Sequence, residues 1–77
     1  MEIRGSVWIN VIKCQNNWYA CWEEEFLGSI YRNRAIELRK KLMDKFIGER
    51  FSVNSKKWTK KDFKTIRIPP IKNRESQ

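Results

Sequence analysis

The spacing of apolar residues along this 77-residue chain changes once, between residues 22 and 30. Residues 3–13 are rich in β-branched and aromatic types that alternate with a period of two, and residues 18–22 repeat that period, which is typical of β-strands. Gln15, Asn16 and Asn17 lie between them and indicate a turn, because Asn tolerates a positive φ. From residue 30 to residue 47, apolar residues recur at intervals of three and four, which predicts an amphipathic helix.

These two periods predict an α+β fold, in which a three-stranded antiparallel sheet carries one helix, residues 30–47, on one face. Residues 26–29 provide the expected third strand, and Gly48 ends the helix. The side chains expected in the core are Ala20, Leu38, Leu42, Phe46 and one or both of Trp18 and Trp22.

A basic C-terminal tail is expected after the helix. The composition changes after residue 54, so we divide the chain into a sheet-plus-helix domain, residues 1–54, and a tail, residues 55–77, which is partly ordered and frayed after residue 70. In this tail, five lysines surround Trp58 and Phe63. These two aromatic side chains can stack on nucleic-acid bases or pack back on the sheet, and the pattern is compatible with both arrangements.

The charge of the chain is distributed unequally along its length. Residues 1–30 carry two basic and four acidic residues, a net charge of −2, whereas residues 31–77 carry fifteen basic and five acidic residues, a net charge of +10. An excess of that size indicates an anionic partner, and nucleic acid is the commonest one for a chain with a pI near 9.9.

Several classes of function find no support in the sequence. The chain has no His, its serines have no partner base, and Glu23, Glu24 and Glu25 are interpreted as a solvated turn, so we expect neither an enzyme nor a metal or cofactor site. Cys14 and Cys21 are expected to be reduced thiols, out of register for a disulfide. Without a membrane span or a signal peptide, a cytoplasmic protein of a bacterium or of an infected host cell is expected.

Short motifs within residues 5–54 resemble a known DNA-binding domain. They are Trp18, Ala20 and Trp22, then Leu27, Gly28 and Ile30, then Ala35, and finally Gly48, Glu49 and Asn54. Their order resembles the three-stranded-sheet-plus-helix domain of plant ethylene-response factors, which is also found in phage homing endonucleases and integrase arm-binding domains. The resemblance implies that fold and a role in DNA binding.

The sequence departs from this family at the positions that read bases. In the family, the residue between the motif Trp and Ala and the residue after Ala are often Arg and point into the major groove, but here they are Tyr19 and Cys21. The hairpin between the second and third strands is also shorter and acidic. We therefore expect contact with phosphates more than recognition of a base sequence.

The resulting hypothesis is a small basic nucleic-acid-binding protein, with DNA favoured over RNA, which serves as an accessory factor of a phage or mobile element. The residues expected to contact the anionic partner are Arg32, Arg34, Arg39, Lys41, Lys45, Lys56, Lys57, Trp58, Lys60, Lys61 and Lys64. The alternative is a protein-binding inhibitor or adaptor, for example a phage counter-defence protein, that blocks a host enzyme or a nucleic-acid groove. An exposed sheet face formed by Trp8, Ile12 and Tyr19 would favour this alternative.

Overall fold

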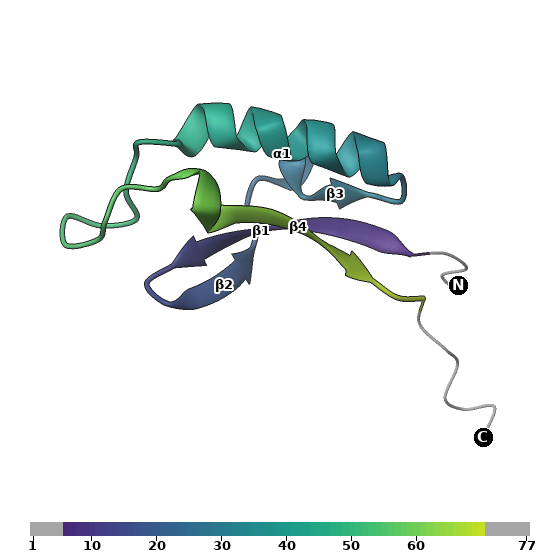
Figure 1. Ribbon diagram of the computed structural model, residues 1–77, viewed down its shortest axis with the longest axis horizontal. Helices are drawn as coiled ribbons and strands as arrows, with labels where there is room; N and C mark the ends of the chain where they lie inside the picture. Colours follow the sequence, from purple (N-terminus) through teal and green to yellow (C-terminus); the bar gives the residue numbers. More distant parts are fainter. Residues whose placement is uncertain (1–5, 71–77) are drawn as a thin grey trace, which may run out of the picture.

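The computed structural model describes residues 6–70 and shows an antiparallel sheet with one helix packed on it (Figure 1). The elements, in chain order, are β1 (Val7–Cys14), β2 (Asn17–Ala20), the 3-10 helix η1 (Glu24–Phe26), β3 (Gly28–Ser29), α1 (Arg32–Phe46), the 3-10 helix η2 (Lys60–Asp62) and β4 (Phe63–Ile68). The expected α+β fold is therefore confirmed, with a fourth strand formed after the helix.

Strand β1 is the centre of the sheet, because every other strand pairs with it. β4 runs antiparallel along one edge of β1, from Val7 to Ile12. β2 and β3 share the opposite edge, where β2 pairs with the second half of β1 and β3 with the first half. The second and third strands therefore do not form the expected hairpin with each other, and residues Glu24–Phe26 form η1 in the connection between them.

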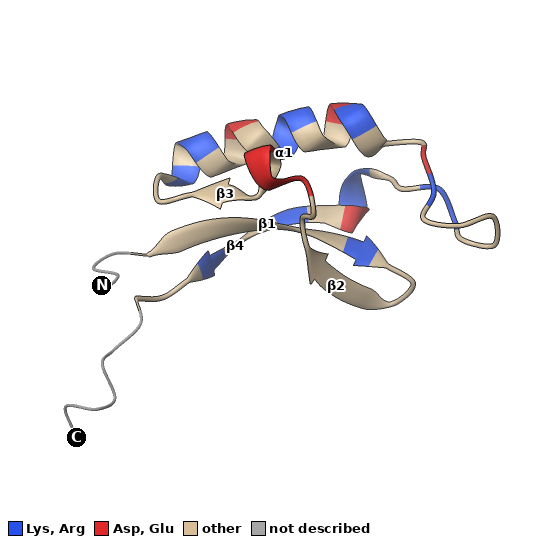
Figure 2. Cartoon of the chain, turned by 180° about the vertical axis from the view of Figure 1, so that it is seen from behind, with Lys and Arg blue, Asp and Glu red and all other residues tan. Residues whose placement is uncertain are grey.

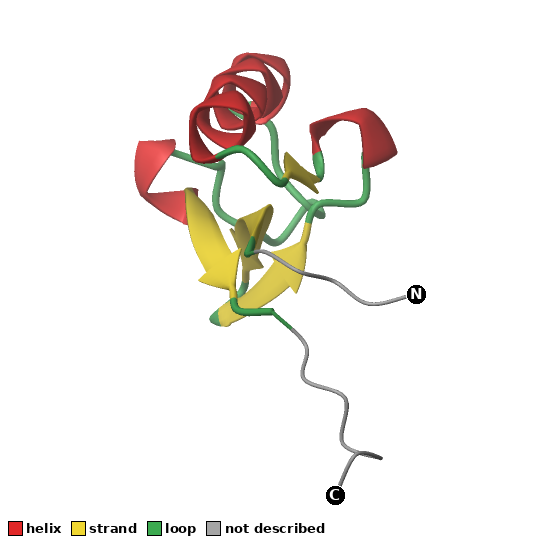
Figure 3. Ribbon diagram, turned by 90° about the vertical axis from the view of Figure 1, so that its right-hand side faces the viewer, coloured by secondary structure: helices red, strands yellow, loops and turns green. Residues whose placement is uncertain are grey.

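Helix α1 covers one face of the sheet, as the end-on view in Figure 3 shows. Its buried residues are Ala35, Leu38 and Leu42, so the predicted burial of both leucines is confirmed. Beneath the helix, Ile12 and Cys14 of β1 pack together with Phe63 of β4. The apolar side chains spaced three and four residues apart on the helix therefore face the side chains of alternate residues on the strands. This is the arrangement that the two periods predict.

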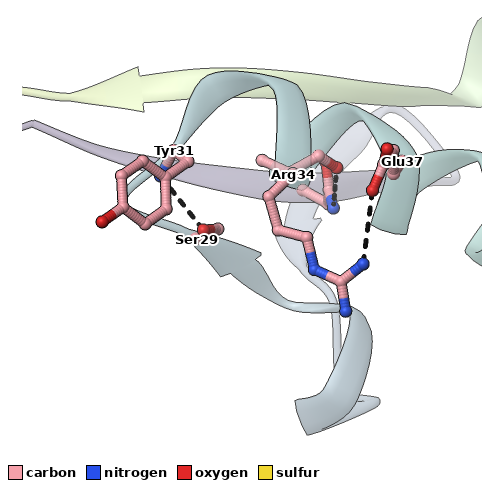
Figure 4. Close-up of polar contacts among 6 residues, drawn as sticks. Ser29, Tyr31, Arg34 and Glu37 are labelled. Carbon is pink, nitrogen blue, oxygen red and sulfur yellow. Dashed lines mark hydrogen bonds and ion pairs between the residues drawn. The ribbon is translucent and has the colours of Figure 1, made fainter.

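The ends of α1 lie close to the predicted limits of residues 30 and 47. At the first end, the backbone N–H of Tyr31 donates to Ser29 Oγ at 3.0 Å (Figure 4). At the second end, Gly48 has φ +86°, a conformation that glycine adopts without strain. Gly28 is required for another reason, since a Cβ there would clash with the carbonyl oxygen of Trp8 on the neighbouring strand.

The predictions for the second strand were wrong. Ala20, Trp18 and Trp22 are exposed. Phe46 at the end of α1, which was also expected in the core, is only partly buried. Ala20 and Trp18 pair with Val11 and Lys13, whose side chains alternate with the helix-facing residues of β1, so both point to the face opposite α1. Cys21, directly after β2, is the buried residue of this segment.

The chain has no structural boundary at residue 54, contrary to our division into a domain and a tail. Trp58 and Phe63 are both buried, with 6% and 5% of their surfaces exposed, and they belong to the same core cluster as Leu42. Thr59 and Asp62 form a capping box at the start of η2, which leads into β4. Of the two alternatives for Trp58, packing on the core is the one that the structure shows. Residues 71–77, expected to be frayed, lie outside the described residues.

We predict that Leu42→Ala lowers the free energy of unfolding by about 2–5 kcal/mol, because Leu42 is fully buried between the helix and the sheet. Urea denaturation followed by circular dichroism measures this loss. Val53→Ala is the control, since 83% of Val53 is exposed and its loss should change little. Equal midpoints for the two variants would contradict the packing described here.

A second prediction compares two tryptophans. Trp58→Ala should cost about 3–5 kcal/mol, because it removes a buried ring and the hydrogen bond from Trp58 Nε1 to the carbonyl oxygen of Lys13. Trp18→Ala should cost clearly less, because Trp18 is 38% exposed on the far face of the sheet. Thermal unfolding of both variants measures the difference, and a Trp58 variant as stable as the Trp18 variant would place Trp58 outside the core.

Candidate nucleic-acid interface

The basic residues of α1 lie on two sides of the helix. Arg34, Lys41 and Lys45 follow one another at helical spacings of seven and four, so they share the side that faces η1. Lys45 Nζ forms a 3.0 Å ion pair with Glu23, and Arg34 forms an exposed 3.3 Å pair with Glu37 (Figure 4). Positive charge on this side therefore has acidic neighbours, which weakens its attraction for an external anion.

Arg32 and Arg39 lie on the other side of the helix, toward β4. The Arg32 guanidinium lies over the Trp8 ring, 5.7 Å from its centroid. Arg39 donates to Thr65 Oγ1 of β4 at 3.1 Å. Arg67, which the sequence analysis did not select, pairs with Trp8 across the sheet and donates to Ser6 Oγ at 2.8 Å. Arg32 and Arg39 on this side of the helix, and Arg67 of β4, are thus each engaged in a contact within the fold.

The predicted lysines after residue 55 are exposed, but they do not form one cluster; they are Lys56, Lys57, Lys60, Lys61 and Lys64. Lys56 and Lys57 precede the buried Trp58, and Lys60 and Lys61 belong to η2. In Figure 2, blue segments lie along the chain between the end of α1 and the start of β4. Lys64 lies on the opposite face of the sheet, where its Nζ is 4.6 Å from the centroid of the Trp18 ring. The structure therefore divides the predicted lysines between two faces.

A groove of about 610 Å³ lies between the β1–β2 turn and the loop that follows α1. Four of its lining residues are lysines, Lys13, Lys56, Lys57 and Lys61, and we call it the lysine groove. The groove also contains one carboxylate, that of Asp62. This carboxylate accepts a 2.9 Å hydrogen bond from the backbone N–H of Thr59 within the capping box. Three of the four lysines were predicted to bind an anion, whereas Lys13 was not among the predicted residues.

A second cavity of about 410 Å³ adjoins the lysine groove, since Cys14, Gln15 and Phe51 line both. Its other lining residues include Tyr19 and Trp22, and we call it the aromatic pocket, after Tyr19, Trp22 and Phe51. Phe51 and Trp22 were not predicted as functional residues. These two residues line the same pocket because the loop after α1 folds back toward β2. No local pattern in the sequence indicates that path of the loop.

The loop that carries Phe51 is held by its own hydrogen bonds. Gly48 N–H donates to the carbonyl oxygen of Trp58 at 3.0 Å, and Trp58 N–H donates to that of Glu49 at 2.8 Å. Within the loop, Ser55 N–H donates to the carbonyl oxygen of Ser52 at 3.0 Å. The shared wall of the two cavities is therefore tied to the buried Trp58.

The sheet face that was predicted for protein interaction is not formed. Ile12 is fully buried beneath α1, and Trp8 is partly covered by Arg32. Of these three residues, Tyr19 alone is largely exposed, at 50%. The prediction was wrong because Trp8 and Ile12 share the face of β1 that the helix covers.

The thiol of Cys14, which lines both cavities, is poorly ionised. Burial raises the pKa of Cys14, and the charge of Asp62 raises it further, while the contact with Trp58 opposes them. Burial also raises the pKa of Cys21, whose Sγ donates to the carbonyl oxygen of Glu23 at 3.4 Å. Both cysteines are free.

Residues 6–70 contain neither a candidate metal site nor a helix that could span a membrane. Within this range, no three His, Cys, Asp or Glu side chains come together in a way that could hold a metal ion. No helix in the same range is long and apolar enough to cross a membrane.

No protein-family model, curated protein or solved structure matches this chain. The resemblance to the ethylene-response-factor type of domain therefore stays a prediction. At the two positions where that family often has Arg, Tyr19 is exposed and Cys21 is buried.

We predict that both thiols react slowly with iodoacetamide at mildly alkaline pH in the folded protein, and rapidly in concentrated urea. Burial and the raised pKa values leave little accessible thiolate in the native state. Mass spectrometry of the alkylated protein over time gives the two rates. Equal rates in buffer and in urea would show that the β1–β2 segment is not packed as described.

Proposed function

We propose that this protein binds nucleic acid, with DNA favoured over RNA, through contacts between the lysine groove and backbone phosphates. The observation that carries the proposal is the convergence of Lys13, Lys56, Lys57 and Lys61 on one groove whose carboxylate is engaged in a capping box. Such a surface attracts a polyanion and releases its counterions when it binds. The function is binding rather than catalysis.

The side chains of the groove favour contact with phosphates over recognition of a base sequence. Lys is a flexible point charge, whereas bidentate recognition of guanine in the major groove mostly uses the planar fork of Arg. The helix arginines that lie toward β4, Arg32 and Arg39, are engaged with Trp8 and Thr65. Little sequence preference is therefore expected, as for an architectural or accessory factor of a phage or mobile element in the cytoplasm of a bacterium or an infected cell.

The proposal predicts strongly salt-dependent binding. With four phosphates neutralised on duplex DNA, log K should fall with log salt at a slope of about −4, and the loss of one lysine should reduce the slope by about 1. Fluorescence anisotropy with labelled duplex and single-stranded oligonucleotides across a salt series measures both quantities. Lys57→Ala is the test variant, because Lys57 lines the groove and is exposed.

Lys41→Ala is the matched control, since it removes the same charge from the side of α1 that faces η1. A larger effect of Lys41→Ala than of Lys57→Ala would move the interface to the helix. No binding of the folded protein to any oligonucleotide at low salt would contradict the proposal.

A protein-binding inhibitor or adaptor is the second candidate. The observation that favours it is the exposure of Tyr19, Trp22 and Phe51 in one pocket, since aromatic side chains are enriched in protein interfaces. Its partner would be an acidic protein surface. Failure of all oligonucleotides to bind would make this candidate the preferred one.

A further inference from the structure

The lysine groove and the aromatic pocket are adjacent cavities. They share Cys14, Gln15 and Phe51 in their linings, so a ligand seated in one lies directly beside the other. The groove supplies positive charge, and the pocket supplies exposed aromatic rings. A ligand that fills both must therefore carry negative charge and an apolar planar group close together.

The rings of the pocket are exposed, although one of them is held in place by neighbouring rings. Trp22 packs against Phe46 and Trp58, with ring centroids 5.5 Å and 5.8 Å away, yet 49% of its surface stays exposed. Tyr19 pairs with Ile12 in the register of β1 and β2, and 50% of its surface is exposed. Phe51 is 59% exposed on the loop after α1. Fixed and exposed aromatic rings are suited to stacking, because little side-chain freedom is lost on binding.

We propose that the aromatic pocket receives an unpaired base of a single-stranded nucleic acid, while the adjoining phosphates lie on the lysine groove. This inference rests on the proposed function and names the form of nucleic acid that the surface prefers. Every base has a face that can stack on an aromatic ring, so this contact does not require a particular sequence. The volume of about 410 Å³ lies within the range of about 300–1,000 Å³ that small-ligand pockets have.

The other polyanions match this surface less well. A duplex offers phosphates to the groove, but its bases are stacked and paired, so none is free to enter the pocket. An acidic peptide can carry aromatic residues, but it does not present a planar group beside each charge. A single strand has one base for each phosphate, which is the combination that the two cavities present side by side.

The test measures the affinity of the full-length protein for three probes of equal length, by fluorescence anisotropy at one low salt concentration. The probes are an oligothymidine of about 12 nucleotides, a duplex, and an abasic strand with the same phosphates but no bases. We expect the oligothymidine to bind more tightly than the other two. Phe51→Ala should weaken oligothymidine binding about ten-fold and leave the abasic strand unchanged, since stacking on one ring is lost.

Tyr31→Ala is the control for the removal of an exposed ring, because Tyr31 is 68% exposed beside α1 and lines neither cavity. It should leave all three affinities unchanged. Phe51→Trp should retain the preference for oligothymidine, which separates stacking from an effect on the loop. Thermal unfolding of each variant verifies that the fold persists.

The outcomes separate this inference from the proposed function. Equal affinities for the oligothymidine and the abasic strand, or an equal effect of Phe51→Ala on both, would overturn the base pocket while phosphate binding stands. No binding to any probe would overturn both proposals. Tighter binding to a copolymer of glutamate and tyrosine than to oligothymidine, lost in Phe51→Ala, would assign the pocket to an acidic protein partner.

Discussion

The side chain of Asn10 is completely buried, and its amide joins three elements to the central strand. Its Nδ2 donates to the carbonyl oxygens of Phe26 at 2.9 Å and Ala35 at 3.0 Å, and its Oδ1 accepts a 2.6 Å bond from Thr65 Oγ1. A buried amide without partners destabilises a protein, so its burial is favourable only when η1, α1 and β4 lie at these positions. In a core this small, such a network selects one arrangement of the elements among several that bury similar apolar area.

The backbone of Asn10 also joins β1 to neighbouring segments, at the edge of β1 opposite β4. Its N–H donates to the carbonyl oxygen of Leu27 at 2.7 Å, and its carbonyl accepts from Cys21 N–H at 3.0 Å. These bonds bridge the gap between β2 and β3, which pair with the two halves of β1. The candidate interface depends on this arrangement, because β1 and β2 supply Lys13 and Tyr19 to the two cavities.

The sequence predicted the elements whose local pattern agrees with their environment. The helix and the strand character of β1 were predictable because period and burial coincide, as for Leu38 and Leu42. β4 was missed because its apolar residues are split between faces, with Phe63 beneath the helix and Ile66 and Ile68 on the far side. The lysine groove was not predictable either, since it exists only where the loop anchored by Trp58 approaches the β1–β2 turn.

The contrast of charge that is visible along the sequence becomes a contrast between sides of the fold. Glu23 of the acidic segment pairs with Lys45, so the acidic residues lie where they offset basic residues of the helix. Lys13, from the same acidic part of the chain, instead lines the groove with Lys56, Lys57 and Lys61. Among residues 6–70, the groove thus combines four lysines with one carboxylate, whereas the side of the helix that faces η1 carries ion pairs with Glu23 and Glu37. On the proposed function, a polyanion that approaches in water would be attracted to that groove before any contact forms, and the aromatic pocket beside it would then meet the uncharged part of the ligand.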